Sequence, residues 1–304
     1  MTAENSILEG IDRGFWDEVV RSDFDVPKGH ELGDLAVDLV HLLSSPDPYD
    51  RDKLALPTLA TWVHRGAFDD LLPGLGDGMC DQLQVGLGER NTDSLFGRTF
   101  AVLVVAAVVE RDNEARLLHP DAVRRWTDRV LAWWVSERDL RGHVPGKGWG
   151  NAVGHGADFI VAVARSRHLR GEELSVLLDA TGERLASTTR HLVNGEEDRL
   201  AYAAMTVLHR EQVPVDLFAD WLAQLTKLGD RGHTDPARAN TVRFLRAMFV
   251  QLAVGVRAMP WHADPQHYDA RPRSRDVLLG EVLGALRAFD PGYLAHPEPG
   301  QDQM

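Results

Sequence analysis

The sequence predicts an all-α protein, and two observations support that fold class. Apolar residues recur at i, i+3, i+4 and i+7 through most of the 304 residues, whereas the period-two alternation of a half-buried strand is nearly absent. Stop signals, mostly Pro and Gly, divide the apolar segments at short intervals. This pattern is typical of helical hairpins stacked in an α-superhelix or closed toward an α/α toroid.

The expected helices follow one another along the chain as amphipathic or wholly apolar stretches. They cover residues 32–43, 54–63, 100–109, 123–134, 149–165, 196–205, 217–228, 245–256 and 279–286. The stretch FAVLVVAAVV at 100–109 is too short to span about 30 Å of hydrocarbon, so we expect a helix buried on all sides. Thr234-Asp235-Pro236 is typical of a helix entry. The whole chain should hold roughly eleven to thirteen helices.

The helices are expected to form one domain. Residues 59–63, 131–135 and 218–222 share an apolar–Ala–x–Trp–aliphatic pattern, spaced near multiples of a helical hairpin of about 40 residues. No shift in composition marks a second domain. We therefore expect a single helical-repeat domain over residues 1–304, with a frayed, Pro-rich tail from about 290 to 304.

Charge and cysteine content restrict the partners and the compartment. The net charge is −13, with 46 acidic and 33 basic residues and no basic stripe, which disfavours nucleic acid and anionic membranes as partners. Cys80 is the only cysteine, so an intrachain disulfide and a multi-cysteine zinc site are excluded. It is expected to be a packing residue. The N-terminal residues do not resemble a signal peptide, and we expect a cytoplasmic protein.

The main candidate site is the stretch RGHVPGKGWGNAVGHGAD at 141–158. Its first glycines and Pro145 predict a loop to about residue 148, and a new helix should begin near 149–151. On that helix Asn151, His155 and Asp158 fall on one polar stripe at i, i+4 and i+7. Glycines at 150, 154 and 156 would let a helix or a ligand approach closely.

Three interpretations of this stripe stay open. In the first, Asn151 caps the helix, His155 is a hydrogen-bonded core residue and Asp158 pairs with an arginine. In the second, the stripe binds a ligand. In the third, a metal binds and takes a further ligand from elsewhere, for which the candidates are His143, Glu110, Asp112 and Asp198. We expect neither a metal nor a cofactor.

Two further polar clusters border apolar helices. Residues 196–199 begin a helix, where acids complement the helix dipole. Residues 110–113 end one, so their acids need a partner such as Arg111 or Arg141. The residues expected to line a ligand site are Arg98, Glu110, Arg111, Asp112, His143, Lys147, Trp149, Asn151, Asp198, Arg199 and Arg246. His262 and His267 are expected in a Pro-containing surface loop.

Four segments, 87–113, 138–158, 195–203 and 240–252, resemble in order a bacterial all-helical family known only as a domain of unknown function. The motif that carries the resemblance is R-G-x-V-P-x-K-G-W-x5-H-x-A-D. The resemblance implies a HEAT-like, α-superhelical fold and no established reaction. The family pattern often has His where this chain has Asn151, and because asparagine is a poor transition-metal ligand, this departure disfavours a metal.

Two functions are compatible with the sequence. The preferred one is a binding or scaffold protein with a polar concave pocket for a small molecule or peptide. The alternative is an enzyme, hydrolase-like or acting on a small metabolite, in which His155 is the acid/base, Asp158 orients it and Arg98, Arg111 or Lys147 holds an anionic group. Signatures of dinucleotide-binding, P-loop, HExxH and GxSxG sites are absent from the sequence.

Overall fold

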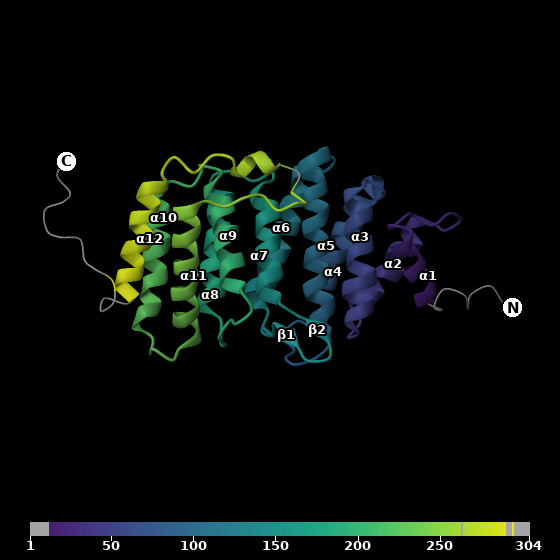
Figure 1. Cartoon of the computed structure of the whole chain (residues 1–304), viewed down its shortest axis with the longest axis horizontal. Coiled ribbons are helices and arrows are strands. Elements are labelled where there is room, and N and C mark those ends of the chain that lie inside the picture. Colours follow the sequence, from purple (N-terminus) through teal and green to yellow (C-terminus); the bar gives the residue numbers. More distant parts are fainter. Residues whose placement is uncertain (1–11, 263, 290–293, 295–304) are drawn as a thin grey trace, which may run out of the picture. The chain divides into compact units, whose positions relative to one another are not determined.

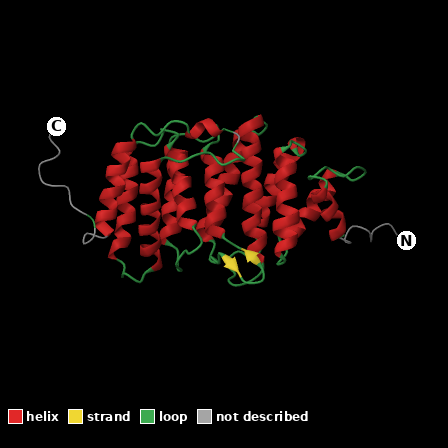
Figure 2. Cartoon of the chain, in the orientation of Figure 1, coloured by secondary structure: helices red, strands yellow, loops and turns green. Residues whose placement is uncertain are grey.

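The computed structural model describes residues 12–262, 264–289 and 294 (Figure 1). In this part of the chain twelve α-helices are joined by short loops, and one two-stranded ribbon is added (Figure 2). The all-α fold class and the predicted number of helices are therefore confirmed. The predicted tail lies, except for residue 294, outside the described residues.

The chain divides into two compact units, Met1–His168 and Leu169–Met304. The prediction of a single helical-repeat domain is not decided by this division and stays a prediction. None of the described helices is long and apolar enough to cross a membrane.

The first unit contains seven α-helices and the ribbon within its described residues. These elements are α1 (Arg13–Arg21), α2 (Leu32–Leu43), the π-helical η1 (Tyr49–Ala55), α3 (Leu56–His64), η2 (Asp69–Leu71), α4 (Leu72–Gln82), α5 (Ser94–Ala115), α6 (Pro120–Ser136), β1 (His143–Val144), β2 (Gly148–Trp149) and α7 (Ala152–Ala164).

Helix α5 is the centre of this unit. It packs against α3, α4 and α7, while α6 packs against α4 and α7 (Figure 1). Its segment 95–109 is buried on nearly every side, as its uninterrupted apolar sequence predicts. Two charged side chains, Arg98 and Asp112, are also fully buried in α5, and each has hydrogen-bonding partners.

The second unit contains five α-helices within its described residues. Its elements are α8 (Glu172–Ala186), α9 (Glu196–Leu208), α10 (Val215–Thr226), η3 (Lys227–Asp230), α11 (Pro236–Val254), η4 (Pro265–Tyr268) and α12 (Arg275–Phe289).

Helices α9 and α11 lie side by side in this unit, and α12 packs against α10 and α11 (Figure 1). Asp235 caps α11, because its Oδ1 accepts a hydrogen bond from the backbone N of Arg238 at 3.1 Å, as the Asp-Pro entry predicts. Gly255, with φ of +96°, ends α11 in a conformation that favours glycine. A long segment, 255–274, then runs to α12 with η4 as its only helical turn among the described residues.

Candidate functional site

Residues 141–151 form a tight connection between α6 and α7. β1 pairs antiparallel with β2, His143 opposite Trp149, so a short ribbon replaces the loop predicted there. Fully buried Arg51 fastens this ribbon to η1, since its Nη2 donates to the carbonyl oxygen of Lys147 at 2.6 Å. Lys147 in turn places its Nζ 2.6 Å from a carboxylate oxygen of Asp93.

The side chains of His143 and Trp149 pack edge-to-face across the ribbon, with ring centroids 5.2 Å apart. Both residues are exposed, Trp149 to 42%. They therefore lie on the surface of the ribbon. Their role in ligand binding is not tested by these contacts and stays a prediction.

The polar stripe on α7 has local partners. Asn151 caps the helix in a left-handed conformation, φ +46°, and its side chain accepts a hydrogen bond from the N of Gly154 at 3.3 Å. His155 is 6% exposed, and its Nδ1 lies 3.1 Å from the carbonyl oxygen of Thr99. Asp158 is half-buried on the same helix. The first two contacts favour the structural interpretation of Asn151 and His155.

Two glycines of this segment are explained by close packing against apolar side chains. A Cβ added to Gly156 would lie 2.1 Å from Nε1 of Trp134 on α6, and one added to Gly150 would lie 2.5 Å from a methyl group of Leu95. Trp134 also donates from Nε1 to the carbonyl oxygen of Ala152. A neighbouring helix, rather than a ligand, therefore occupies the space that Gly156 leaves open.

The acids at the end of α5 pair with arginines that follow α7. Arg165 Nη1 donates to Glu110 Oε1 at 2.5 Å, and Arg167 Nη1 donates to Asp112 Oδ2 at 2.8 Å. His168 Nε2 lies 3.1 Å from the same Oδ2, yet burial keeps the pKa of this histidine below its ordinary value.

The partners predicted for these acids were wrong. Arg111 forms a bidentate pair with Asp69, at 2.7 and 2.8 Å, and Arg141 pairs with Asp139 at 2.7 Å. Because the Asp69 carboxylate accepts two of its hydrogen bonds, the pKa of Arg111 is raised.

Arg98, like Asp112, is a fully buried member of the predicted ligand-binding residues. Its Nε and Nη2 donate to the two carboxylate oxygens of Glu137 at 2.6 and 3.2 Å, and its Nη1 donates to the carbonyl oxygen of Val85 and to Ser94. Neither side chain of the Arg98–Glu137 pair is exposed to solvent. Arg98 and Glu137 therefore form a buried ion pair inside the core of the first unit.

The remaining predicted residues belong to the second unit. Asp198 is exposed in the first turn of α9, and its carbonyl oxygen accepts a hydrogen bond from Gln251. Burial lowers the pKa of Arg199 to about 10. Arg246 is exposed on α11 and borders a small, largely apolar cavity of about 200 Å³.

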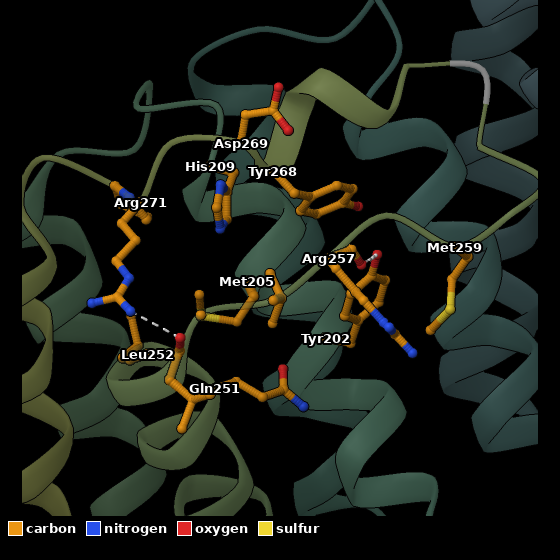
Figure 3. Close-up of a pocket in the computed structure, with 14 residues that line it drawn as sticks. Tyr202, Met205, His209, Gln251, Leu252, Arg257, Met259, Tyr268, Asp269 and Arg271 are labelled. Atoms are coloured by element: carbon orange, nitrogen blue, oxygen red, sulfur yellow. Dashed lines mark hydrogen bonds between the residues drawn. The ribbon is translucent and has the colours of Figure 1, made fainter.

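A larger cavity, of about 530 Å³, lies elsewhere in the second unit (Figure 3). Helix α9 and its C-cap contribute Tyr202, Met205 and His209, the end of α11 contributes Gln251 and Leu252, and the rest of the wall comes from residues 254–259 and 268–272. None of the predicted site residues lines this cavity.

Two buried polar atoms in the wall have no hydrogen-bond partner in the described part of the chain. They are Nε2 of His209 and Oε1 of Gln251. In Figure 3 the two side chains lie above and below Met205 and face the same space. Burial lowers the pKa of His209, although the nearby carbonyls of His267 and Ala270 act in the opposite direction, so the ring is neutral at neutral pH.

Aromatic contacts hold segment 255–274 over α9. The rings of Tyr202 and Tyr268 stack with centroids 5.5 Å apart, and His262 stacks on both. The hydroxyl of Tyr202 donates to the carbonyl oxygen of Arg257 at 2.9 Å, and His267 Nε2 lies 3.1 Å from the carbonyl oxygen of Thr206. Both histidines lie in the Pro-containing segment that the sequence predicted, but His262 is only 8% exposed and both pack against α9, so the predicted surface position does not hold for His262.

The charged residues of the wall are two arginines and one aspartate. Arg271 donates from Nη2 to the carbonyl oxygen of Val254 at 3.0 Å, and Arg257 uses its backbone carbonyl for Tyr202. Neither guanidinium forms an ion pair with a carboxylate of the described residues, Asp269 included. Within residues 12–262 and 264–289, no three His, Cys, Asp or Glu side chains converge as a metal site.

Comparison with known families gives one match. A family model described as a protein of unknown function (DUF2785) matches residues 83–250, more than half of the chain. The chain belongs to this family. No curated protein and no solved structure matches it.

The DUF2785 match includes every site residue predicted from the sequence, from Arg98 to Arg246. It also includes the α9 side of the cavity, at Tyr202, Met205 and His209. It ends at residue 250, so Gln251 and segment 255–274 lie beyond the part of the chain that matches the DUF2785 model.

Proposed function

We propose that the protein binds a small organic molecule in the cavity formed by α9, the end of α11 and segment 255–274. The observation that carries the proposal is the pair of buried, unsatisfied atoms, His209 Nε2 and Gln251 Oε1. A buried polar group without a partner costs about 1–3 kcal/mol, so native proteins rarely keep one without a reason. A ligand that hydrogen-bonds to both atoms would remove this cost.

The size and lining of the cavity support a small molecule over a peptide. Its volume of about 530 Å³ falls inside the range of roughly 300–1,000 Å³ that is usual for small-molecule sites. Apolar side chains such as Met205 and Leu252 stand beside a few polar groups, which is the usual composition of such sites.

We further propose that the helices of each unit form a short stretch of a HEAT-like stack. In the first unit α3, α5 and α7 contact one another in sequence, as do α4 and α6. In the second unit α8, α10 and α12 form one such series, and α9 and α11 form another. Contacts between every second helix are what stacked helical hairpins produce.

Acid–base catalysis by His155 and Asp158 is the alternative function and stays a prediction. The buried ring of His155 and its bond to the Thr99 carbonyl favour a packing role. Neither residue lines the cavity of about 530 Å³. The binding proposal therefore has the stronger support.

The proposal is tested with a variant that fills the cavity. Val256→Trp places an indole in the wall of the cavity, whereas Val277→Trp places one on the 52% exposed face of α12 and is the matched control. The three proteins are screened against a library of small metabolites by thermal shift, and small molecules that copurify with each are extracted and identified by mass spectrometry.

We expect the wild type and Val277→Trp to share at least one stabilising or copurifying compound that Val256→Trp has lost. If all three proteins respond to the same compounds, the ligand binds elsewhere and the proposal is wrong. A wild-type protein that carries no compound and responds to none of the library would also contradict it.

A further inference from the structure

We infer that the ligand of this cavity is a monoanionic carboxylate with an apolar body. This inference rests on the proposed function, because it specifies what the same cavity binds. It is carried by Arg257 and Arg271, two exposed residues that line the cavity and form no ion pair with an acidic side chain of the described residues.

These two arginines contrast with several others in the same unit. Arg243 lies 2.5 Å from a carboxylate oxygen of Glu197, and Arg275 lies 2.7 Å from one of Asp276. Arg273, two residues from Arg271 and 93% exposed, still lies 3.3 Å from Glu211. Acidic side chains are abundant in a chain of net charge −13, yet these two exposed cavity arginines form no ion pair with an acidic side chain of the described residues.

The placement of the arginines leaves their donors available to a ligand. In Figure 3 Arg271 lies on one side of Met205 and Arg257 on the other. Arg271 uses one Nη2 hydrogen for the carbonyl oxygen of Val254, which fixes the side chain while other N–H groups remain for a ligand. A guanidinium has five N–H donors in a planar fork that matches a carboxylate in a bidentate manner.

The charge of the wall favours a monoanion over a phosphate dianion. Two arginines face one aspartate, Asp269, and His209 is neutral because burial lowers its pKa. The wall therefore carries an excess of one positive charge, which one carboxylate neutralises.

The rest of the wall indicates an apolar body that also carries a hydrogen-bond donor. Met205, Leu252 and Met259 offer apolar surface, and methionine adapts to ligands of different shape. Oε1 of Gln251 can only accept a hydrogen bond, because its Nε2 already donates to the carbonyl oxygen of Asp198 at 3.0 Å. A ligand that also carries an N–H or O–H group would satisfy it.

Isothermal titration calorimetry with matched neutral and anionic compounds tests the inference. The probes are benzoate, hexanoate and indole-3-acetate, each compared with its primary amide, which has nearly the same shape and no charge. We expect at least one carboxylate to bind about tenfold or more tightly than its amide, because hydrogen bonds to charged groups are worth about 1.5–3 kcal/mol.

The arginine variants locate that preference. In Arg271→Gln, or in Arg257→Gln should the first variant disturb the segment, the carboxylate should fall to the affinity of the amide. Arg273→Gln removes an exposed charge from the same segment without touching the cavity wall and should keep the full preference. Thermal melting of each variant confirms that it is folded.

The outcomes separate this inference from the proposed function. Equal binding of amides and carboxylates would overturn the anionic ligand and leave the cavity as a binding site. A preference that survives both cavity variants, or that is lost equally in Arg273→Gln, would show that the cavity arginines do not select the carboxylate. Binding of none of the six probes would also overturn the inference, while the metabolite screen decides the proposed function on its own.

Discussion

Replacing Gly156 with alanine tests whether this glycine is there for helix packing. The added Cβ would lie 2.1 Å from Nε1 and 2.3 Å from Cδ1 of Trp134, whereas unstrained contacts between such atoms are about 3.5–4.0 Å. Trp134 is 1% exposed, and its Nε1 is bonded to Ala152, so the ring cannot move aside freely.

The expected magnitude follows from three opposing effects. Overpacking of a core costs typically 1–3 kcal/mol, and loss of the Trp134–Ala152 hydrogen bond adds about 1 kcal/mol. Alanine regains about 1 kcal/mol of helix propensity over glycine. We therefore expect Gly156→Ala to lower the free energy of unfolding by about 2 kcal/mol.

Urea unfolding followed by circular dichroism measures this change. Gly78→Ala is the matched control, because Gly78 lies inside α4 of the same unit, is exposed, and an added Cβ meets nothing within 4 Å. The control should gain about 0.5–1 kcal/mol. If Gly156→Ala is as stable as Gly78→Ala, the packing explanation is refuted.

Three further predictions concern buried ionisable groups. Arg98→Met should lower the free energy of unfolding by about 3–5 kcal/mol, since it leaves the Glu137 carboxylate buried without its counter-charge. Removal of the half-exposed Arg129, which pairs with the exposed Asp81, should cost less than about 1 kcal/mol, and urea unfolding compares the two variants. Burial raises the pKa of Cys80 to about 12, so iodoacetamide at pH 8 should label it only after denaturation, and rapid labelling of the folded protein would contradict its burial. Burial lowers the pKa of His209 in the folded protein, so the unfolded chain binds this proton first as pH falls below about 6.5. His209 should therefore lower the free energy of unfolding in that pH range, and His209→Gln should flatten this part of the stability–pH profile. An unchanged profile would contradict this role of His209.

The sequence predicted what depends on local pattern. Apolar periodicity located most of the helices, the uninterrupted apolar run predicted the burial of α5, and Asp235 was identified as a helix cap from its neighbouring proline. Asn151 was likewise a candidate cap. Each of these features is decided within a few residues along the chain.

Contacts between residues far apart in the chain could not be predicted from the sequence. Glu110 and Asp112 find their partners in Arg165 and Arg167, about 55 residues later, because α5 and α7 pack side by side. Arg111 and Arg141, which were the partners proposed from the sequence, pair with Asp69 and Asp139 instead.

The cavity was missed for the same reason. His209 and Gln251 are single polar residues at the ends of two helices, and no motif distinguishes them. The remaining wall comes from a segment without periodicity. The available signal was the density of aromatic and histidine residues at 261–268, which the sequence alone explained as a surface loop.

Hydrogen–deuterium exchange distinguishes a ligand bound in the cavity of the second unit from one bound at the glycine-rich residues 141–158. The protein is compared with and without the tightest-binding carboxylate of the panel. We expect slower exchange in peptides that cover residues 199–209 and 251–272, with residues 141–158 unchanged. Slowing concentrated at 141–158, with no change at 251–272, would contradict it and return the site to His155 and Asp158.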